Sequence, residues 1–149
     1  MARHSWKLTR DPLYRGDSES GISQPAPNAS PSIVRHILYL EGFGRPTPYL
    51  SATEVRETAD SFAGSGGRTY VGRPSDWPKH GVFHRSRKEL LLLLRGHGKG
   101  DANWPSAFEV MRAHQYVEES QEHLADFRKV GDLSGEELSG IVNATFSAK

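Results

Sequence analysis

The stretch that decides the fold is residues 48–71, which read PYLSATEVRETADSFAGSGGRTYV. Residues 48–51 begin with a proline, which an aromatic and an aliphatic side chain follow, and this composition is typical of a strand. Apolar side chains then recur at helical spacing, and Ser51 with Glu54 matches an S-x-x-E capping box at the start of a helix. The glycine-rich residues 64–67 end that helix, and residues 68–71 again have the composition of a strand.

The segments on either side alternate between strand and helix without a regular β-α-β rhythm. The apolar segment 33–40 suits a strand or a short helix, with the helix favoured, and the run 90–94 fits either a buried strand or a helical turn. A helix is predicted from Pro105 to a point before Ser120. Further strands are predicted at residues 12–16, 82–83, 121–130 and 141–146, with a helical turn at 135–138. This mixture favours an α+β fold over a doubly wound parallel sheet.

Length and composition predict one domain over residues 1–149, with an irregular arm at 1–10 and a loop at 17–32. The chain has 149 residues, of which 36% are hydrophobic, enough apolar material for a core. Its 19 Lys and Arg nearly balance 18 Asp and Glu, which disfavours nonspecific nucleic-acid binding. The absence of cysteine excludes disulfide scaffolds, thiolate nucleophiles and cysteine-ligated metal centres.

No segment of the sequence predicts a membrane span or a classical signal peptide. The longest purely apolar run, residues 90–94, is far shorter than the ~20 residues that a span needs. The first seven residues, MARHSWK, contain no apolar signal core. We therefore expect a soluble chain.

For three local patterns we favour a structural explanation. Residues 96–100 (GHGKG) could cradle a phosphate, but they lack the P-loop register, so we expect a loop. His80 and His84 flank Gly81 without an H-E-x-x-H pattern, which favours surface histidines over metal ligands. The basic run 84–88 is expected to be a solvated face.

Four separated elements form a larger pattern. The first is Leu13-Tyr14-Arg15-Gly16-Asp17-Ser18, where Arg15 offers a planar donor suited to a pyrophosphate. There follow His36, the segment 49–53 (YLSAT) and the segment 120–122 (SQE), in which the period of a strand places Ser120 and Glu122 on one face. Taken singly, Arg15 also fits a surface salt bridge, Ser51 a helix N-cap and Glu122 an exposed carboxylate.

In this order the motifs resemble the mono-ADP-ribosyltransferase toxins of the cholera and pertussis A-subunit type, which include the heat-labile enterotoxins. That family opens with a Leu-Tyr-Arg-x-Asp-Ser strand, carries a His before an aromatic-x-Ser-Thr-Ser strand, and ends with a Glu-x-Glu pair. The resemblance spans residues 11–142. It implies the ADP-ribosyltransferase fold, a split mixed β-sandwich with flanking helices, and NAD as the substrate with no metal.

The resemblance also implies a role for each matching residue. Glu122 would be the essential catalytic carboxylate, oriented by Ser51, and would stabilise the oxocarbenium-like ribose as nicotinamide leaves. Arg15 would hold the NAD phosphate or ribose and brace the cleft. The NAD contacts implied by the family are Arg15, Gly16, Asp17, His36, Ser51 and Thr53.

The sequence departs from the family pattern at two places. In the second motif Ala52 takes the middle Thr position and Thr53 replaces the last Ser, so the hydroxyl is kept at both outer positions. Ser120 stands where arginine-modifying members have their first Glu, which removes the general base for a guanidinium acceptor; Glu119 is the other acceptor-side candidate. Two alternatives to the transferase hypothesis therefore stay open, an NAD glycohydrolase and an inactive NAD-fold binding module. A third hypothesis is a phosphate-binding module at residues 96–100.

Partners and location follow from the resemblance as expectations. The acceptor is a target macromolecule, with a host or competitor protein favoured and a nucleic acid left open, and an immunity protein is a further candidate partner. The family implies a secreted or translocated toxin or effector that acts in the cytoplasm of a target cell.

Overall fold

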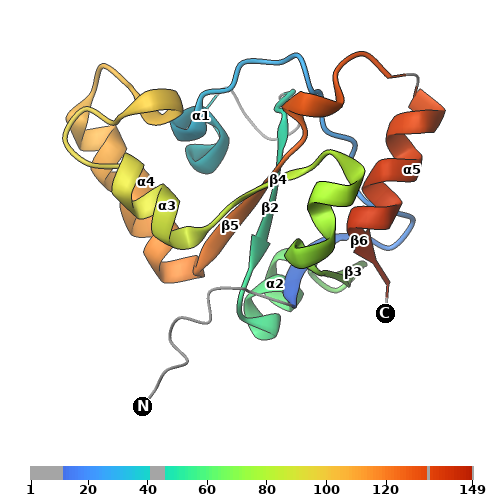
Figure 1. Ribbon diagram of the computed structural model, residues 1–149. Helices are drawn as coiled ribbons and strands as arrows, with labels where there is room; N and C mark the ends of the chain where they lie inside the picture. The colour runs from blue at the N-terminus through green and yellow to red at the C-terminus, as the bar shows by residue number, and fades with distance from the viewer. Residues whose placement is uncertain (1–11, 41–45, 134, 149) are drawn as a thin grey trace.

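The computed structural model describes residues 12–40, 46–133 and 135–148 and has an α+β architecture (Figure 1). The strands are β1 (Leu13–Ser18), β2 (Tyr49–Thr53), β3 (Gly67–Gly72), β4 (Phe83–Arg85), β5 (Glu122–Asp126) and β6 (Phe146–Ser147). The α-helices are α1 (Ile33–Leu38), α2 (Arg56–Ala63), α3 (Arg87–Leu93), α4 (Ala107–Ser120) and α5 (Gly135–Thr145). Short 3₁₀ helices are η2 (Pro74–His80), η3 (Gly100–Ala102) and η4 (Arg128–Val130).

The strands form one curled sheet in the order β4-β5-β2-β1-β3-β6. Neighbouring strands in this order run antiparallel to each other, so the mixed sheet that the family resemblance implied is wrong for the described residues. In the pairing of β2 with β5, Ser51 lies beside Leu124 and Thr53 beside Glu122. The two motifs 49–53 and 120–122 are therefore brought together by strand pairing.

Each face of the sheet packs against its own group of helices. Tyr49 and Leu124 point into a core shared with α1, α3 and α4, whereas Leu50 and Ala125 point into a core shared with η2 and α5. This division follows from the strand period, which sends alternate side chains to opposite faces. Trp77 of η2 is fully buried in the second core and donates its indole N–H to the Thr145 carbonyl at 3.2 Å.

Helix α2 packs closely against β1 because Gly16 has no side chain. A Cβ atom at Gly16 would lie 2.1 Å from the Ala59 carbonyl oxygen and 2.6 Å from the Ala63 nitrogen. Contacts that short do not occur, so a larger residue would displace the helix. Gly16 thus has a packing role in the fold, and its predicted main-chain contact with NAD stays a prediction.

Several sequence-based predictions of local structure are confirmed. The segment 33–40 is helical over Ile33–Leu38, as favoured, and the Ser32 side chain accepts a hydrogen bond from the Arg35 N–H as N-cap. The run 90–94, for which strand and helix were both open, lies in and just after α3. The strand predicted at 12–16 is present as β1, although it continues through Ser18 into the predicted loop 17–32. The predicted arm 1–10 lies outside the described residues.

The expected final strand at 141–146 is wrong, because α5 continues to Thr145 and only Phe146 and Ser147 are extended. The β-branched residues of this segment have strand propensity, but Leu138, Val142 and Thr145 are spaced to face the core from one side of a helix. The helix predicted from Pro105 begins instead at Ala107, because the Ser106 side chain caps it by accepting from the Glu109 N–H at 3.2 Å.

The basic run 84–88 is not a solvated face. Arg85 is largely buried and forms ion pairs with Glu89 at 2.7 Å and Asp101 at 2.9 Å. His84, expected at the surface, is half-buried and shares a 2.8 Å hydrogen bond with His123. Glu89 is a local partner, four residues after Arg85, but Asp101 and His123 come from distant parts of the chain, which local sequence patterns do not show. Within the described ranges, no helix is both long and apolar enough to cross a membrane.

Candidate active site

Ser51, in the middle of β2, connects the side chains of two other elements. Its hydroxyl donates to Glu122 Oε2 at 2.6 Å and also lies 2.8 Å from His36 Nε2. A hydroxyl has one proton, so His36 Nε2 donates to Ser51 Oγ when Ser51 donates to Glu122. Thr47 Oγ1 lies 2.9 Å from the other ring nitrogen of His36. This chain of hydrogen bonds orients the carboxylate of Glu122.

The alternative explanation of Ser51 as a helix N-cap is wrong. Ser51 lies within β2, and α2 begins at Arg56 with Val55 as a cap residue that makes no side-chain hydrogen bond. Thr53, not Ser51, accepts a hydrogen bond from the Val55 N–H at 3.1 Å. The carboxylate of Glu54 contacts Arg87 and His123 instead, so it does not complete a capping box. The hydroxyl of Ser51 is therefore left for Glu122 and His36.

Arg15 of β1 is held next to this group by two fixed contacts. Its Nη1 donates to the Ser51 carbonyl at 2.8 Å, and its Nε and Nη2 contact Asp17 Oδ2 at 3.0 and 2.9 Å. Asp17 also accepts from the N–H and hydroxyl of Ser23 at 2.8 and 3.0 Å. Burial raises the pKa of Asp17, but Arg15 and these hydrogen bonds outweigh burial, and the pKa lies below its ordinary value. Arg15 thus has an ionised partner that fixes its orientation.

Glu122 is a buried carboxylate with few compensating donors. It is only 8% exposed, and burial raises its pKa to about 7 even though the Ser51 hydrogen bond and the charge of Arg15 act in the opposite direction. Its Oε1 has no hydrogen bond to the described residues. A carboxylate that titrates near neutrality beside a fixed arginine is typical of a functional site.

Comparisons of the chain with protein-family models, curated proteins and solved structures find no match. The assignment of this site therefore depends on the geometry and on the motifs alone.

Thr53 supports the turn that precedes Glu122. Its hydroxyl, in a residue only 4% exposed, donates to the Ser120 carbonyl at 2.6 Å. The expected common face of Ser120 and Glu122 on one strand is wrong, because Ser120 is the last residue of α4 and Gln121 adopts a left-handed conformation with φ of 49°. Glu119 lies on the exposed last turn of α4, and the left-handed Gln121 makes the connection to β5 irregular, which is the condition under which Glu119 was expected to replace Ser120.

The structure adds Tyr39, which sequence analysis did not single out. Tyr39 ends α1 in the left-handed conformation, with φ of 54°, and its N–H lies at the carbonyls of Arg35 and His36. Burial and the negative charge of Glu122 raise the pKa of the Tyr39 phenol, while the charge of Arg15 acts in the opposite direction, so both groups lie within electrostatic range of the phenol. Tyr39 is 46% exposed and therefore lies at the edge of the site. An aromatic residue three positions after His36 was the available signal.

A second polar cluster lies on the opposite side of β5. His123 Nε2 lies 2.7 Å from Glu54 Oε2, its Nδ1 contacts His84, and Arg87 donates to both oxygens of Glu54 at 3.0 and 3.3 Å. Because neighbouring strand residues face opposite ways, His123 is turned away from the side chain of Glu122. This cluster ties β4, β5 and the start of α3 together.

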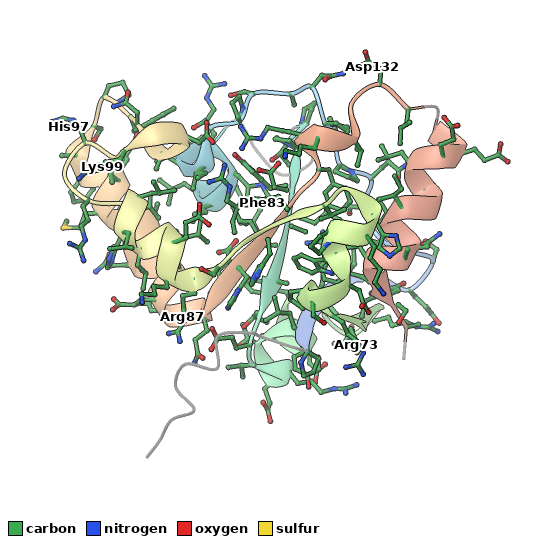
Figure 2. The ribbon with its side chains drawn as sticks, in the orientation of Figure 1. Arg73, Phe83, Arg87, His97, Lys99 and Asp132 are labelled. Carbon is green, nitrogen blue, oxygen red and sulfur yellow. The ribbon has the colours of Figure 1, made fainter. Side chains whose placement is uncertain are left out.

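Residues 96–100 have the structure of a tight loop, as favoured. Gly98 has a positive φ of 79°, and a Cβ there would lie 1.8 Å from the Ala102 carbonyl oxygen. Figure 2 shows His97 and Lys99 at the far end of the α3–α4 pair. Among the described residues, no group of three or more His, Asp or Glu is placed to hold a metal ion.

Proposed function

We propose that this chain is a mono-ADP-ribosyltransferase that cleaves NAD between nicotinamide and ribose and passes the ADP-ribose to an acceptor. One observation carries the proposal: Glu122, Ser51 and Arg15 converge from β5, β2 and β1. These are the residues at which the sequence resembles that family. The curled antiparallel sheet with helices on both faces is compatible with the ADP-ribosyltransferase fold.

The negative charge of Glu122 suits cleavage of the glycosidic bond between nicotinamide and ribose. When the glycosidic bond opens, its electron pair leaves with nicotinamide and positive charge develops on the ribose. A fixed anion in a site with little water stabilises that charge strongly. Ser51 holds Oε2 of Glu122, which leaves Oε1 for the ribose. The acceptor then bonds to the ribose carbon and loses its proton.

Arg15 has donors left for the phosphates of NAD. A guanidinium carries five N–H groups, and three of those of Arg15 are used by Asp17 and the Ser51 carbonyl. The two that remain have no partner among the described residues. Since Asp17 fixes the plane of the guanidinium, a phosphate would meet a pre-oriented donor pair. Asp17 therefore acts on NAD through Arg15.

Hydrolysis of NAD is a second candidate activity, and the turn before Glu122 favours it. Ser120 supplies no carboxylate, and its carbonyl is occupied by Thr53. A protein side chain then lacks the base that would take its proton, unless Glu119 supplies it, whereas water needs less assistance. In the transferase proposal the acceptor is a protein of a host or competitor, and the chain acts as a secreted or translocated effector in the target cell.

The decisive experiment is chromatographic measurement of nicotinamide release from NAD, with and without a cell lysate. Glu122→Gln keeps the shape of the side chain and removes its charge, and Glu118→Gln, on the exposed surface of α4, is the matched control. We expect turnover by the wild type and the control but not by Glu122→Gln. Lysate-dependent turnover with labelled ADP-ribose on protein indicates transfer, and lysate-independent turnover indicates hydrolysis. Binding of NAD without turnover would instead identify an inactive binding module.

A further inference from the structure

The far end of the α3–α4 pair carries exposed apolar side chains. α3 and α4 pack against each other and run in opposite directions, so the end of α3 and the start of α4 lie together at this end (Figure 1). Leu92 of α3 is 51% exposed, and Phe108 and Met111 of α4 are 62% and 52% exposed. We call these three side chains the apolar tip. Residues 83–120, which include it, are described without a gap.

The helix period turns the apolar tip away from the core. Val110, Ala113 and Val117 form the buried face of α4. Phe108 and Met111, three positions apart, lie on the other side of the helix. Single exposed apolar side chains are normal on a protein surface, whereas several that share one end of the molecule indicate an interaction site. The apolar tip therefore provides a face that the fold itself does not use.

Exposed basic side chains accompany the apolar tip. Arg95 and Lys99 lie in the connection between the two helices, and Figure 2 shows Lys99 at the far end of the pair. Arg112 follows Phe108 by four positions, which places both on the same face of α4. All three basic side chains are exposed, and none forms a salt bridge with a described residue. Arg112 donates only to the hydroxyl of Tyr116, at 3.1 Å.

The carboxylates of the same region have partners elsewhere. Asp101 pairs with Arg85 at 2.9 Å and with Arg128 at 3.0 Å. Glu109 accepts a hydrogen bond from the indole N–H of Trp104 at 2.6 Å. The exposed charge around the apolar tip is therefore positive, and a matching surface carries anions next to an apolar layer.

We propose that the apolar tip docks on the surface of a bilayer that contains anionic phospholipid. The three apolar side chains enter the boundary between headgroups and acyl chains, and the basic side chains stay with the phosphates. A second copy of the chain would bring like charges together, which opposes self-association. A nucleic acid would meet the cations but leave the apolar side chains in water. The docking surface is separate from Glu122 and does not depend on the proposed NAD chemistry.

The first test is sedimentation of the full chain with lipid vesicles at physiological ionic strength. One set of vesicles is an equimolar mixture of phosphatidylcholine and phosphatidylserine, and the other is phosphatidylcholine alone. We expect binding to the anionic vesicles to be at least about tenfold tighter, because several basic side chains act together at the surface. High salt should weaken that binding, since it screens the attraction.

Two pairs of variants locate the contact. Lys99→Glu should weaken binding to anionic vesicles at least about tenfold, because a carboxylate is repelled by the phosphates. Arg73→Glu changes the net charge equally but lies at the opposite end of the molecule (Figure 2), so it should weaken binding about twofold or less. Phe108→Ser should weaken binding about fivefold, because the ring no longer enters the bilayer. Phe62→Ser, on α2, is its matched control, since Phe62 is 63% exposed, and it should have little effect.

Insertion is tested separately by fluorescence. With phospholipids that carry bromine on their acyl chains, the emission added by Phe108→Trp should be quenched, and that added by Phe62→Trp should not. The proposal is overturned by absence of binding to anionic vesicles, by equal binding to neutral ones, or by equal effects of each variant and its control. Binding of polyglutamate that depends on Lys99, without quenching of Phe108→Trp by lipid, would indicate an acidic protein partner and would also overturn it.

Discussion

Each end of β5 carries a buried carboxylate, but folding raises the pKa of one and lowers the pKa of the other. Glu122 and Asp126 are four residues apart on one face of the strand and are 8% and 3% exposed. Burial raises the pKa of both, yet the pKa of Glu122 ends near 7 and that of Asp126 ends below its ordinary value. The difference is the supply of donors. Burial alone therefore does not mark a reactive carboxylate.

The donors at Asp126 are charged and numerous. Arg128 donates from its backbone N–H at 3.0 Å and from its guanidinium at 2.8 to 3.2 Å, and Arg85 adds a longer contact at 3.4 Å. Glu122 receives one short hydrogen bond, from the neutral hydroxyl of Ser51, while Arg15 binds the Ser51 carbonyl instead. Asp126 is thus suited to hold the structure, and Glu122 to respond to a ligand with positive charge.

The largest expected effect is on activity at the Glu122 end. Glu122→Gln should lower NAD cleavage about 10²- to 10³-fold, because it removes the anion that stabilises the ribose cation. Asp126→Asn, corrected for the folded fraction, should retain most of the activity. Steady-state kinetics with both variants tests the contrast, and equal losses would show that the two ends do not differ in role.

At the Asp126 end the main effect is on stability. Arg128→Ala removes most donors of a buried carboxylate and should lower the free energy of unfolding by about 3 kcal/mol. Chemical denaturation measures it, with Arg95→Ala, an exposed arginine in the turn after α3, as control. A loss no larger than that of the control would mean that Arg85 alone satisfies Asp126.

The two ends should also respond oppositely to pH. The pKa of Glu122 is higher in the folded protein, so its favourable contribution is complete below about 4.5 and is lost as pH rises to about 7. Glu122→Gln should therefore stabilise the protein at about pH 8 by up to about 3 kcal/mol and much less below about pH 5. Denaturation at both pH values measures this.

For Asp126 the sign is reversed. Its pKa is lowered by folding, so its contribution is present above the ordinary value of 3.8 and disappears as pH falls through the lower folded value. Asp126→Asn should consequently destabilise the protein most near neutrality and least in acid. If the effects of both substitutions on the free energy of unfolding changed with pH in the same direction, the difference between Glu122 and Asp126 would be contradicted.

The pH dependence of catalysis gives a smaller effect. Catalysis needs ionised Glu122, so the rate at saturating NAD should fall about tenfold between pH 8 and pH 6 if the pKa of about 7 holds in the complex. In that complex the positive charge of the bound nicotinamide ring lowers the pKa of Glu122 and would shift the profile to lower pH. A rate that is constant across this range would show that Glu122 is ionised throughout.

Much of the candidate site was predictable because its residues stand in ordered motifs. The sequence placed Arg15, Ser51 and Glu122 on three strands, and all three are found on β1, β2 and β5. It failed at Ser120, which was assigned to the strand of Glu122 but is the last residue of α4. It also failed at α5, where β-branched residues suggested a strand although their spacing serves a helix.

Composition, apolar spacing and short motifs determined the α+β class, most element positions and the candidate residues, because these depend on local propensity and on the period of each element. The tertiary structure alone decided which of these residues meet. Pairing of β2 with β5 brought Ser51 to Glu122, and the packing of α1 brought His36 and Tyr39 to the same place. It also decided which donors reach Glu122, since its hydrogen bond comes from Ser51, 71 positions away, and such a distant partner is invisible to any local pattern.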